Sequence, residues 1–402
     1  MTVSGVGWSW LLDDVVRVVF SWDEEPALAA RRLDGVLRRV TPHELIRLES
    51  GYRSRRYSLG ALGRGALAGD LTPDDPPDGP PDDATADAMT DRYGTAVAAL
   101  MSFDRSGYLR EAGVARLAGT DDPFAVPFLL LRLNDPVEQV RVLSQDAVAA
   151  RLGPEHVGLL VELLPLVDGL RRRRRAGRVL AAVEELLHRG GMEALWNGAR
   201  SDDPLIRESS LRWLARTDPV AAAGAALRTR DPALWQWAAR TATSPRLTPA
   251  EQDALLPLLE GSSSPRIRLR ALRARARQPH GEAQLRRAVL DPDARIRYHA
   301  RATLYARGHT DLAPQVYRDA LAPAAVPDTT AIGALGGLAD LGSARDVPRI
   351  LDFTAHPRAR VRAEAWRALG ILAPEEVSRR TDRLAADPSN KVRRHLPAPP
   401  TD

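Results

Sequence analysis

The sequence predicts an all-α protein: an α-solenoid of about nine to ten helix pairs, preceded by a helical N-terminal region. Three observations predict this class. A short pattern recurs along the last three quarters of the 402 residues, apolar residues return every three to four positions, and aromatic residues make up only 5% of the chain. Strands would instead show aromatic and β-branched residues alternating with polar ones.

The recurring pattern is a small or polar residue, a proline, three variable residues, an aliphatic residue and an arginine. The 252 residues between Pro136 and Pro388 divide into eight intervals of 31.5 residues, and a period near 30 is typical of a helical solenoid. We expect the residue before each proline to cap the second helix of a pair, and the proline to set its first turn. Five copies are complete: Asp135-Pro136 with Val140-Arg141, Ser264-Pro265 with Leu269-Arg270, Asp291-Pro292 with Ile296-Arg297, His356-Pro357 with Val361-Arg362, and Asp387-Pro388 with Val392-Arg393.

The chain divides into four predicted parts. Residues 1–68 form a helical N-terminal region, in which Thr41, Pro42 and Glu44 have the spacing of a capping box at a helix start. Residues 69–91 form an acidic linker rich in proline and aspartate, which cannot bury a core and is expected to be disordered. Residues 92–396 form the repeat solenoid, and residues 397–402 a disordered tail.

Composition excludes several classes of protein. The chain has no cysteine, so disulfides, thiolate zinc sites and cysteine nucleophiles are ruled out. It has no apolar run long enough to span a bilayer and no basic leader at its N-terminus, so we expect a cytoplasmic protein that does not bind membranes. Charge is uneven: residues 1–91 carry 10 arginines against 16 acidic residues, a net of −6, and residues 92–402 carry a net of +11.

The pattern D-P-x-x-x-V-R-x-x-A-x-x-A-L resembles HEAT and HEAT-like (PBS-lyase type) repeats, which are arrays of antiparallel helix pairs. The resemblance covers about residues 92–396. It implies a ladder of Asp–Arg contacts between repeats, formed by Asp135, Asp291 and Asp387 with Arg141, Arg297 and Arg362. Ser264 and His356 depart from the acidic position. We interpret the repeat-borne arginines as structural: Arg141, Arg270, Arg297, Arg362 and Arg393.

No motif indicates catalysis. The eight histidines lack metal-ligand spacing, and the phosphate-binding and nucleophile motifs are absent. We therefore predict no catalytic residue, no metal site and no cofactor.

A run of five arginines, Arg171, Arg172, Arg173, Arg174 and Arg175, stands outside the repeat pattern. It covers every side of the start of a predicted helix, where positive charge opposes the helix macrodipole. An acidic protein surface or a phosphate backbone would relieve this repulsion. The alternative is a solvated face in an arginine-rich chain.

Tryptophans from consecutive repeats form a second group: Trp196, Trp213, Trp235 and Trp237. Trp235 and Trp237 are two residues apart, so on a helix they cannot both face one core. Trp213, Trp235 and Trp237 are candidate contacts for a partner, and the alternative is that the rings fill gaps between helices.

The sequence thus predicts a non-catalytic scaffold or regulatory adaptor. Its predicted partner is another protein with an acidic surface, bound through Arg171–Arg175 and the tryptophans. The alternative is a nucleic-acid-binding protein, and the resemblance adds an alkylpurine DNA glycosylase of the HEAT-like type as one form of it. A third possible function, the attachment of phycobilins, is implied by the repeat resemblance alone.

Overall fold

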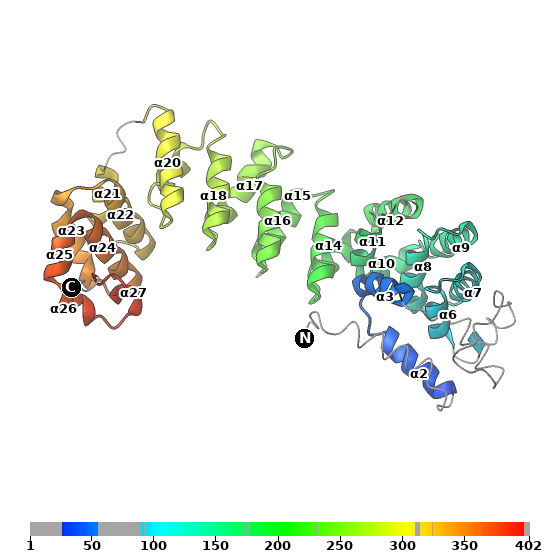
Figure 1. Ribbon diagram of the computed structural model, residues 1–402. Helices are drawn as coiled ribbons and strands as arrows, with labels where there is room; N and C mark the ends of the chain where they lie inside the picture. The colour runs from blue at the N-terminus through cyan, green and yellow to red at the C-terminus, as the bar shows by residue number, and fades with distance from the viewer. Residues whose placement is uncertain are drawn as a thin grey trace. The chain divides into compact units, whose positions relative to one another are not determined.

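The computed structural model describes residues 26–54, 90–91, 94–171, 173, 175, 177–229, 231–309, 314–323 and 325–397. These residues form α-helices, short 3₁₀ helices and turns, which confirms the predicted all-α solenoid (Figure 1). The chain divides into two compact units, Met1–Asp218 and Pro219–Asp402. Of the predicted linker, only Thr90 and Asp91 are described, and both are helical.

Unit 1 consists of two N-terminal helices followed by stacked helix pairs. Each pair packs onto the next, as when α7 contacts α6 and α9, or α13 contacts α10 and α14. The helices are α2 (Pro26–Leu37), α3 (Pro42–Ser54), α6 (Thr95–Met101), α7 (Gly107–Ala118), α8 (Val126–Arg132), α9 (Glu138–Ala149), α10 (Val157–Glu162), α11 (Leu164–Leu170), α12 (Gly177–Gly190), α13 (Met192–Gly198) and α14 (Pro204–Leu214).

The N-terminal helices belong to the core of unit 1. Helix α2 packs against α6, and α3 packs against α8 and α11. Leu33, Leu37 and Leu48 are almost completely buried in these contacts. Helix α3 begins at Pro42 as predicted, and the Glu44 carboxylate accepts the backbone N–H of Thr41 at 2.9 Å.

Unit 2 continues the same plan. Its second helices form a row in which α16, α18, α20, α22 and α24 each contact the next, and the first three stand side by side in Figure 1. The helices are α15 (Pro219–Arg228), α16 (Pro232–Ala242), α17 (Pro249–Glu260), α18 (Pro265–Arg275), α19 (Glu282–Ala288), α20 (Ala294–Ala306), α21 (Gln315–Leu321), α22 (Asp328–Leu341), α23 (Val347–Asp352), α24 (Ala359–Leu372), α25 (Pro374–Arg379), α26 (Thr381–Ala385) and α27 (Asn390–Arg393).

One hydrogen-bond arrangement recurs in the turns that precede the second helices. A turn residue accepts, through its side chain, the backbone N–H two residues ahead, as Asp135 does from Val137 at 3.0 Å. Six residues after the turn residue, a clamp residue donates to the turn residue's carbonyl, as Arg141 does to Asp135 at 2.8 Å. The other turn–clamp pairs are Asp104–Arg110, Ser201–Arg207, Thr229–Trp235, Ser262–Arg268, Asp291–Arg297, His356–Arg362 and Asp387–Arg393.

Three clamp arginines also connect one repeat to the next. Arg362 donates both Nε and Nη2 to the Asp387 carboxylate, at 2.7 and 2.9 Å, and these bonds lower the pKa of Asp387. Arg110 binds Asp135 and Arg268 binds Asp291 with the same two-point geometry. Two-point pairing of a guanidinium with a carboxylate fixes orientation as well as adding energy.

Where it forms, the ladder therefore runs from a clamp arginine to the acid of the following turn. Arg362 makes this contact as the resemblance implies. Arg297 instead pairs with Asp340 at 3.2 Å, and the described contacts of Arg141 are with backbone carbonyls. These arginines are structural, as predicted.

The structure corrects the register of one copy. In the turn before α18 the clamp is Arg268, not Arg270, and the buried aliphatic residue is Ile267, with 1% of its surface exposed. The reason is that Pro265 is the first residue of its helix, whereas Pro136 lies two residues before Glu138, where α9 begins. The residue before proline is predicted to cap the helix. This holds for Asp203 and Asp231. It is wrong for the four complete copies in which the proline lies before the helix, those at Pro136, Pro292, Pro357 and Pro388.

Glycines in α22 allow close packing. A Cβ on Gly333 would overlap the carbonyl oxygen of Leu290, and one on Gly337 would overlap the Tyr317 ring. Both glycines are buried, so they mark a tight contact between repeats.

We predict that Gly333→Ala lowers the free energy of unfolding by about 2 kcal/mol or more, because the backbone of Leu290 cannot yield to the added methyl group. The matched control is Gly370→Ala in α24, where nothing lies within 4 Å of the added Cβ. There alanine should stabilise the protein by about 0.5–1 kcal/mol. Urea denaturation measures both, and equal effects would contradict this account of α22.

We predict that Asp135→Asn destabilises the protein by about 3–5 kcal/mol, because it removes the buried partner of Arg110 and Arg132. The exposed Asp121→Asn in the same unit should change stability by less than about 0.5 kcal/mol. Denaturant midpoints compare the two, and a similar small effect at both positions would show that the Asp135 contacts contribute little.

Candidate functional site

Trp213 of α14 lies in a polar setting within unit 1. Only 4% of its surface is exposed, and its indole N–H donates to Asp168 at 3.0 Å. The guanidinium groups of Arg171 and Arg216 lie over its ring, 4.4 and 4.3 Å from the centroid. A cation over an aromatic face is attracted by the ring quadrupole, so Trp213 holds both arginines in place.

Glu184 of α12 joins the two arginines. Its carboxylate accepts from Arg171 at 3.2 Å and from Arg216 at 2.6 Å. With Asp168 it balances their two positive charges. We call these five residues the Trp213 cluster: Asp168, Arg171, Glu184, Trp213 and Arg216.

A pocket of about 480 Å³ lies against this cluster. Leu187, Met192 and Leu195, from α12 and α13, provide apolar lining, and Arg216 lies at the charged part of the wall. Glu184, Glu185 and His188 also line it, so the pocket carries charges of both signs around an apolar centre.

Arg173 has a different environment, facing the N-terminal region. Its Nη1 lies 3.6 Å from the Glu49 carboxylate of α3, and burial lowers the pKa of Arg173 below its ordinary value. Glu49 is itself 5% exposed and also pairs with Arg132. Arg173 thus helps to attach α3 to the first repeats.

Arg132, which pairs with Glu49, also binds Asp135, one of the acids of the ladder. Asp135 accepts from Arg110 and Arg132, and Arg53 lies 3.6 Å from it. Burial alone would raise the pKa of Asp135, but the hydrogen bonds from Arg110 and from the Val137 N–H hold it below its ordinary value. Burial lowers the pKa of Arg132 to about 10.

Arg175 and Arg178 remain exposed beside the start of α12. The guanidinium of Arg175 reaches only the carbonyl of Asp135, at 3.4 Å, and no described carboxylate forms an ion pair with Arg175 or Arg178. Arg172 and Arg174 lie outside the described residues. Of the predicted arginine run, then, Arg171 and Arg173 make internal contacts and Arg175 remains available to a partner.

Trp235 and Trp237 both lie on α16 of unit 2, and both are half-buried. Trp235 takes the clamp position of its repeat, where its indole N–H donates to the Thr229 carbonyl at 2.6 Å. Trp235 therefore replaces the arginine that donates to the turn carbonyl in the other turn–clamp pairs. The sequence showed the pair of rings, but the substitution of tryptophan for a clamp arginine becomes visible only in the structure.

Among the described residues, no group of three or more histidine, aspartate or glutamate side chains is placed to hold a metal ion. None of the described helices combines the length and apolar character that a bilayer crossing needs. Sequence reasoning missed Glu49, Glu184 and Arg216. The ion pairs that join them to other helices connect residues 13 or more positions apart in the chain, and no local pattern marks such pairs.

Among known proteins, matches to this chain were found only in the comparison with solved structures. No protein-family model matches the chain, and no curated protein does. The karyopherin Kap121p bound to Nup53p aligns with 95% of this chain at 14% identity and a TM-score of 0.32. Kap121p bound to the extreme C-terminus of the protein phosphatase Cdc14p aligns with 94% at 14% identity and the same TM-score.

This chain spans about half the length of that karyopherin, 47% in both alignments. The solenoid assignment therefore depends on the helix order and helix packing of this chain, and not on its similarity to the karyopherin.

We predict that Trp213→Phe lowers stability by about 1–2 kcal/mol, because phenylalanine lacks the N–H that binds Asp168 and attracts cations less strongly. Glu184→Gln should lower it too, since it removes the carboxylate that Arg171 and Arg216 share. Thermal denaturation of both variants tests this, and two unchanged midpoints would show that the Trp213 cluster does not hold its arginines.

Proposed function

We propose that this chain is a non-catalytic HEAT-like solenoid of the PBS-lyase type, which acts in the cytoplasm as a scaffold or regulatory adaptor and binds an acidic surface of another protein. The observation that carries the proposal is the pair Arg175 and Arg178: both are exposed at the start of α12, and no described carboxylate pairs with them. Arg171 and Arg173, the other described arginines of the run, have internal partners.

The position of these two arginines favours an anionic partner. Positive charge near a helix N-terminus opposes the macrodipole, so leaving both residues unpaired there costs free energy. A carboxylate from a partner would relieve this repulsion and form charge-assisted hydrogen bonds. In the proposed interface, Arg171 and Trp213 position the neighbouring surface, and Arg175 contacts the partner directly.

The pocket beside the Trp213 cluster supports a protein as the partner. Its lining joins apolar side chains with Glu184 and Glu185. Both carboxylates already pair with arginines, Glu184 with Arg216 and Glu185 with Arg189, so the pocket mainly offers its apolar side chains to a partner. A protein segment can place an apolar side chain against them, and a phosphate backbone cannot. A protein partner therefore fits this surface better than a nucleic acid does. We propose Trp235 and Trp237 as further partner contacts on unit 2.

We predict that the double variant Arg175→Glu/Arg178→Glu weakens binding of a fluorescein-labelled peptide of alternating glutamate and leucine by about tenfold or more, a loss of about 1.4 kcal/mol. The control is Arg360→Glu/Arg383→Glu, which changes the net charge equally at two exposed arginines of unit 2. Fluorescence anisotropy at low and physiological salt measures both.

The same titration with labelled duplex DNA separates the two function classes. Tight DNA binding with a steep salt slope, lost in the Arg175→Glu/Arg178→Glu variant, would favour the nucleic-acid alternative. Equal peptide affinity in both double variants, or no peptide binding at low salt, would overturn the proposed surface.

A further inference from the structure

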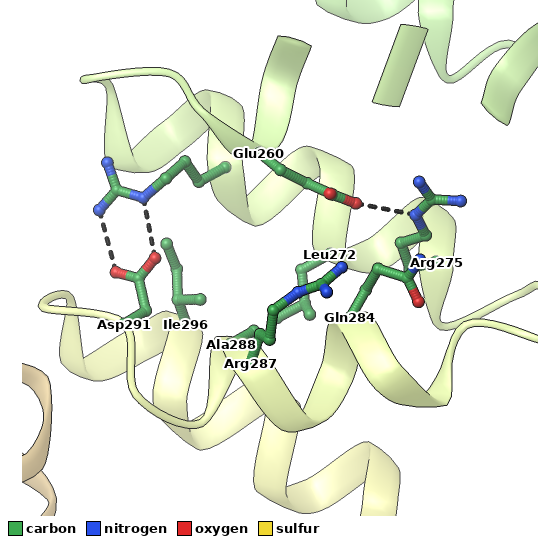
Figure 2. Close-up of a pocket in the computed structure, with 9 residues that line it drawn as sticks. Glu260, Leu272, Arg275, Gln284, Arg287, Ala288, Asp291 and Ile296 are labelled. Atoms are coloured by element: carbon green, nitrogen blue, oxygen red, sulfur yellow. Dashed lines mark hydrogen bonds and ion pairs between the residues drawn. The ribbon is translucent and has the colours of Figure 1, made fainter. Parts of the chain in front are cut away.

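A pocket of about 250 Å³ lies in unit 2 between α17, α18, α19 and the start of α20 (Figure 2). Its apolar lining comes from Leu272, Ala288 and Ile296. Leu272 and Ile296 are almost buried, with 5% and 1% of their surface exposed. Ala288 is half-buried, so it leaves apolar surface on which a small aliphatic group can pack.

Two ion pairs bound the pocket, as Figure 2 shows. Glu260 accepts from Arg275 Nε at 2.8 Å. Asp291 accepts from Arg268 Nε and Nη2 at 2.8 and 2.9 Å, which is one of the ladder contacts. These pairs hold the walls in fixed positions and leave little of their own charge uncompensated.

Two groups in the pocket lack partners among the described residues. Arg287 of α19 is exposed to solvent and forms no ion pair there, and in Figure 2 its guanidinium lies among the lining side chains. The Oε1 atom of Gln284 is buried and accepts no hydrogen bond. A buried acceptor without a donor carries a desolvation cost of about 1–3 kcal/mol, which a donor from a ligand would remove.

The charges that line the pocket set the ligand's charge. Arg268 pairs with Asp291, and Arg275 pairs with Glu260 and, outside the pocket lining, with Asp253. Arg287 is therefore the arginine of the lining that has no ion pair among the described residues. A carboxylate supplies one negative charge and matches the guanidinium fork. A phosphate dianion would carry twice the charge needed and would approach Glu260 and Asp291.

We propose that this pocket receives an aspartate or glutamate side chain from an extended segment of a partner protein. The carboxylate pairs with Arg287, a backbone N–H of the segment donates to Gln284 Oε1, and a neighbouring aliphatic side chain covers Ala288. The proposal rests on the chain being a protein-binding scaffold, and it adds a second contact point within unit 2.

The test uses two labelled peptides, acetylated and amidated, that differ at one position: Ala-Leu-Glu-Leu-Ala and Ala-Leu-Gln-Leu-Ala. Binding to the full chain is followed by fluorescence anisotropy. We expect the glutamate peptide to bind about tenfold more tightly than the glutamine peptide. Arg287→Met should remove this difference. Arg266→Met, which changes an exposed arginine of α18 outside the pocket, should keep it.

Gln284→Leu provides a second readout. This variant removes the buried Oε1 atom, which has no hydrogen-bond partner, so the melting temperature should stay unchanged or rise. The affinity for the glutamate peptide should fall several-fold. Equal binding of the two peptides, or an unchanged preference in Arg287→Met, would overturn the proposal. Glutarate and inorganic phosphate are also compared as competitors of the labelled glutamate peptide, and we expect glutarate to compete at lower concentration. Equal competition by phosphate would overturn the proposal.

The outcome is separable from that of the proposed function. The Arg175→Glu/Arg178→Glu variant leaves the pocket residues untouched, so it should keep the preference for glutamate over glutamine. If the preference is missing in every protein while the α12 variant still loses the acidic peptide, the pocket proposal fails and the scaffold proposal stands. If the preference for glutamate is present and the α12 variant binds the acidic peptide as well as its control does, the pocket proposal stands and the proposed α12 surface fails.

Discussion

The turn–clamp pair is the interaction on which the stacking of this protein depends. A turn between two helices leaves backbone carbonyls without partners, and the clamp arginine satisfies them six residues later in the chain. The same guanidinium can then bind the carboxylate of the next turn, as Arg362 binds Asp387. One side chain thereby fixes a turn within its own repeat and the distance to the next repeat.

Two of the features that point to binding lie where this arrangement changes. Within the described residues, no turn–clamp pair occurs between Arg141 and Ser201, and this interval contains the arginine run and three of the five residues of the Trp213 cluster. In unit 2, Trp235 replaces the clamp arginine. The pocket with Arg287 instead uses a regular ladder contact, Arg268–Asp291, as one wall. The repeat thus serves as a rigid frame for side chains outside its own pattern.

The repeat period and the helical class could be predicted from the sequence, because each unit repeats the same local chemistry. The register of the copy at Pro265 could not, because proline occupies two different places in these turns. The turn at Asp104 was missed since it has no proline. The internal contacts of Arg171 and Arg173 join residues far apart in the chain, such as Glu49 and Trp213, and only the folded structure brings those together.

A double-mutant cycle on Arg362 and Asp387 tests the role of the ladder most directly. Arg362→Met, Asp387→Asn and the double variant would be compared with the parent chain by urea denaturation. The account predicts a coupling energy of about 1.5–3 kcal/mol, the range for hydrogen bonds between charged groups. The exposed pair Arg286–Glu282, treated in the same way, should couple by less than about 0.5 kcal/mol. Additive effects at Arg362 and Asp387 would contradict the claim that the ladder connects the repeats.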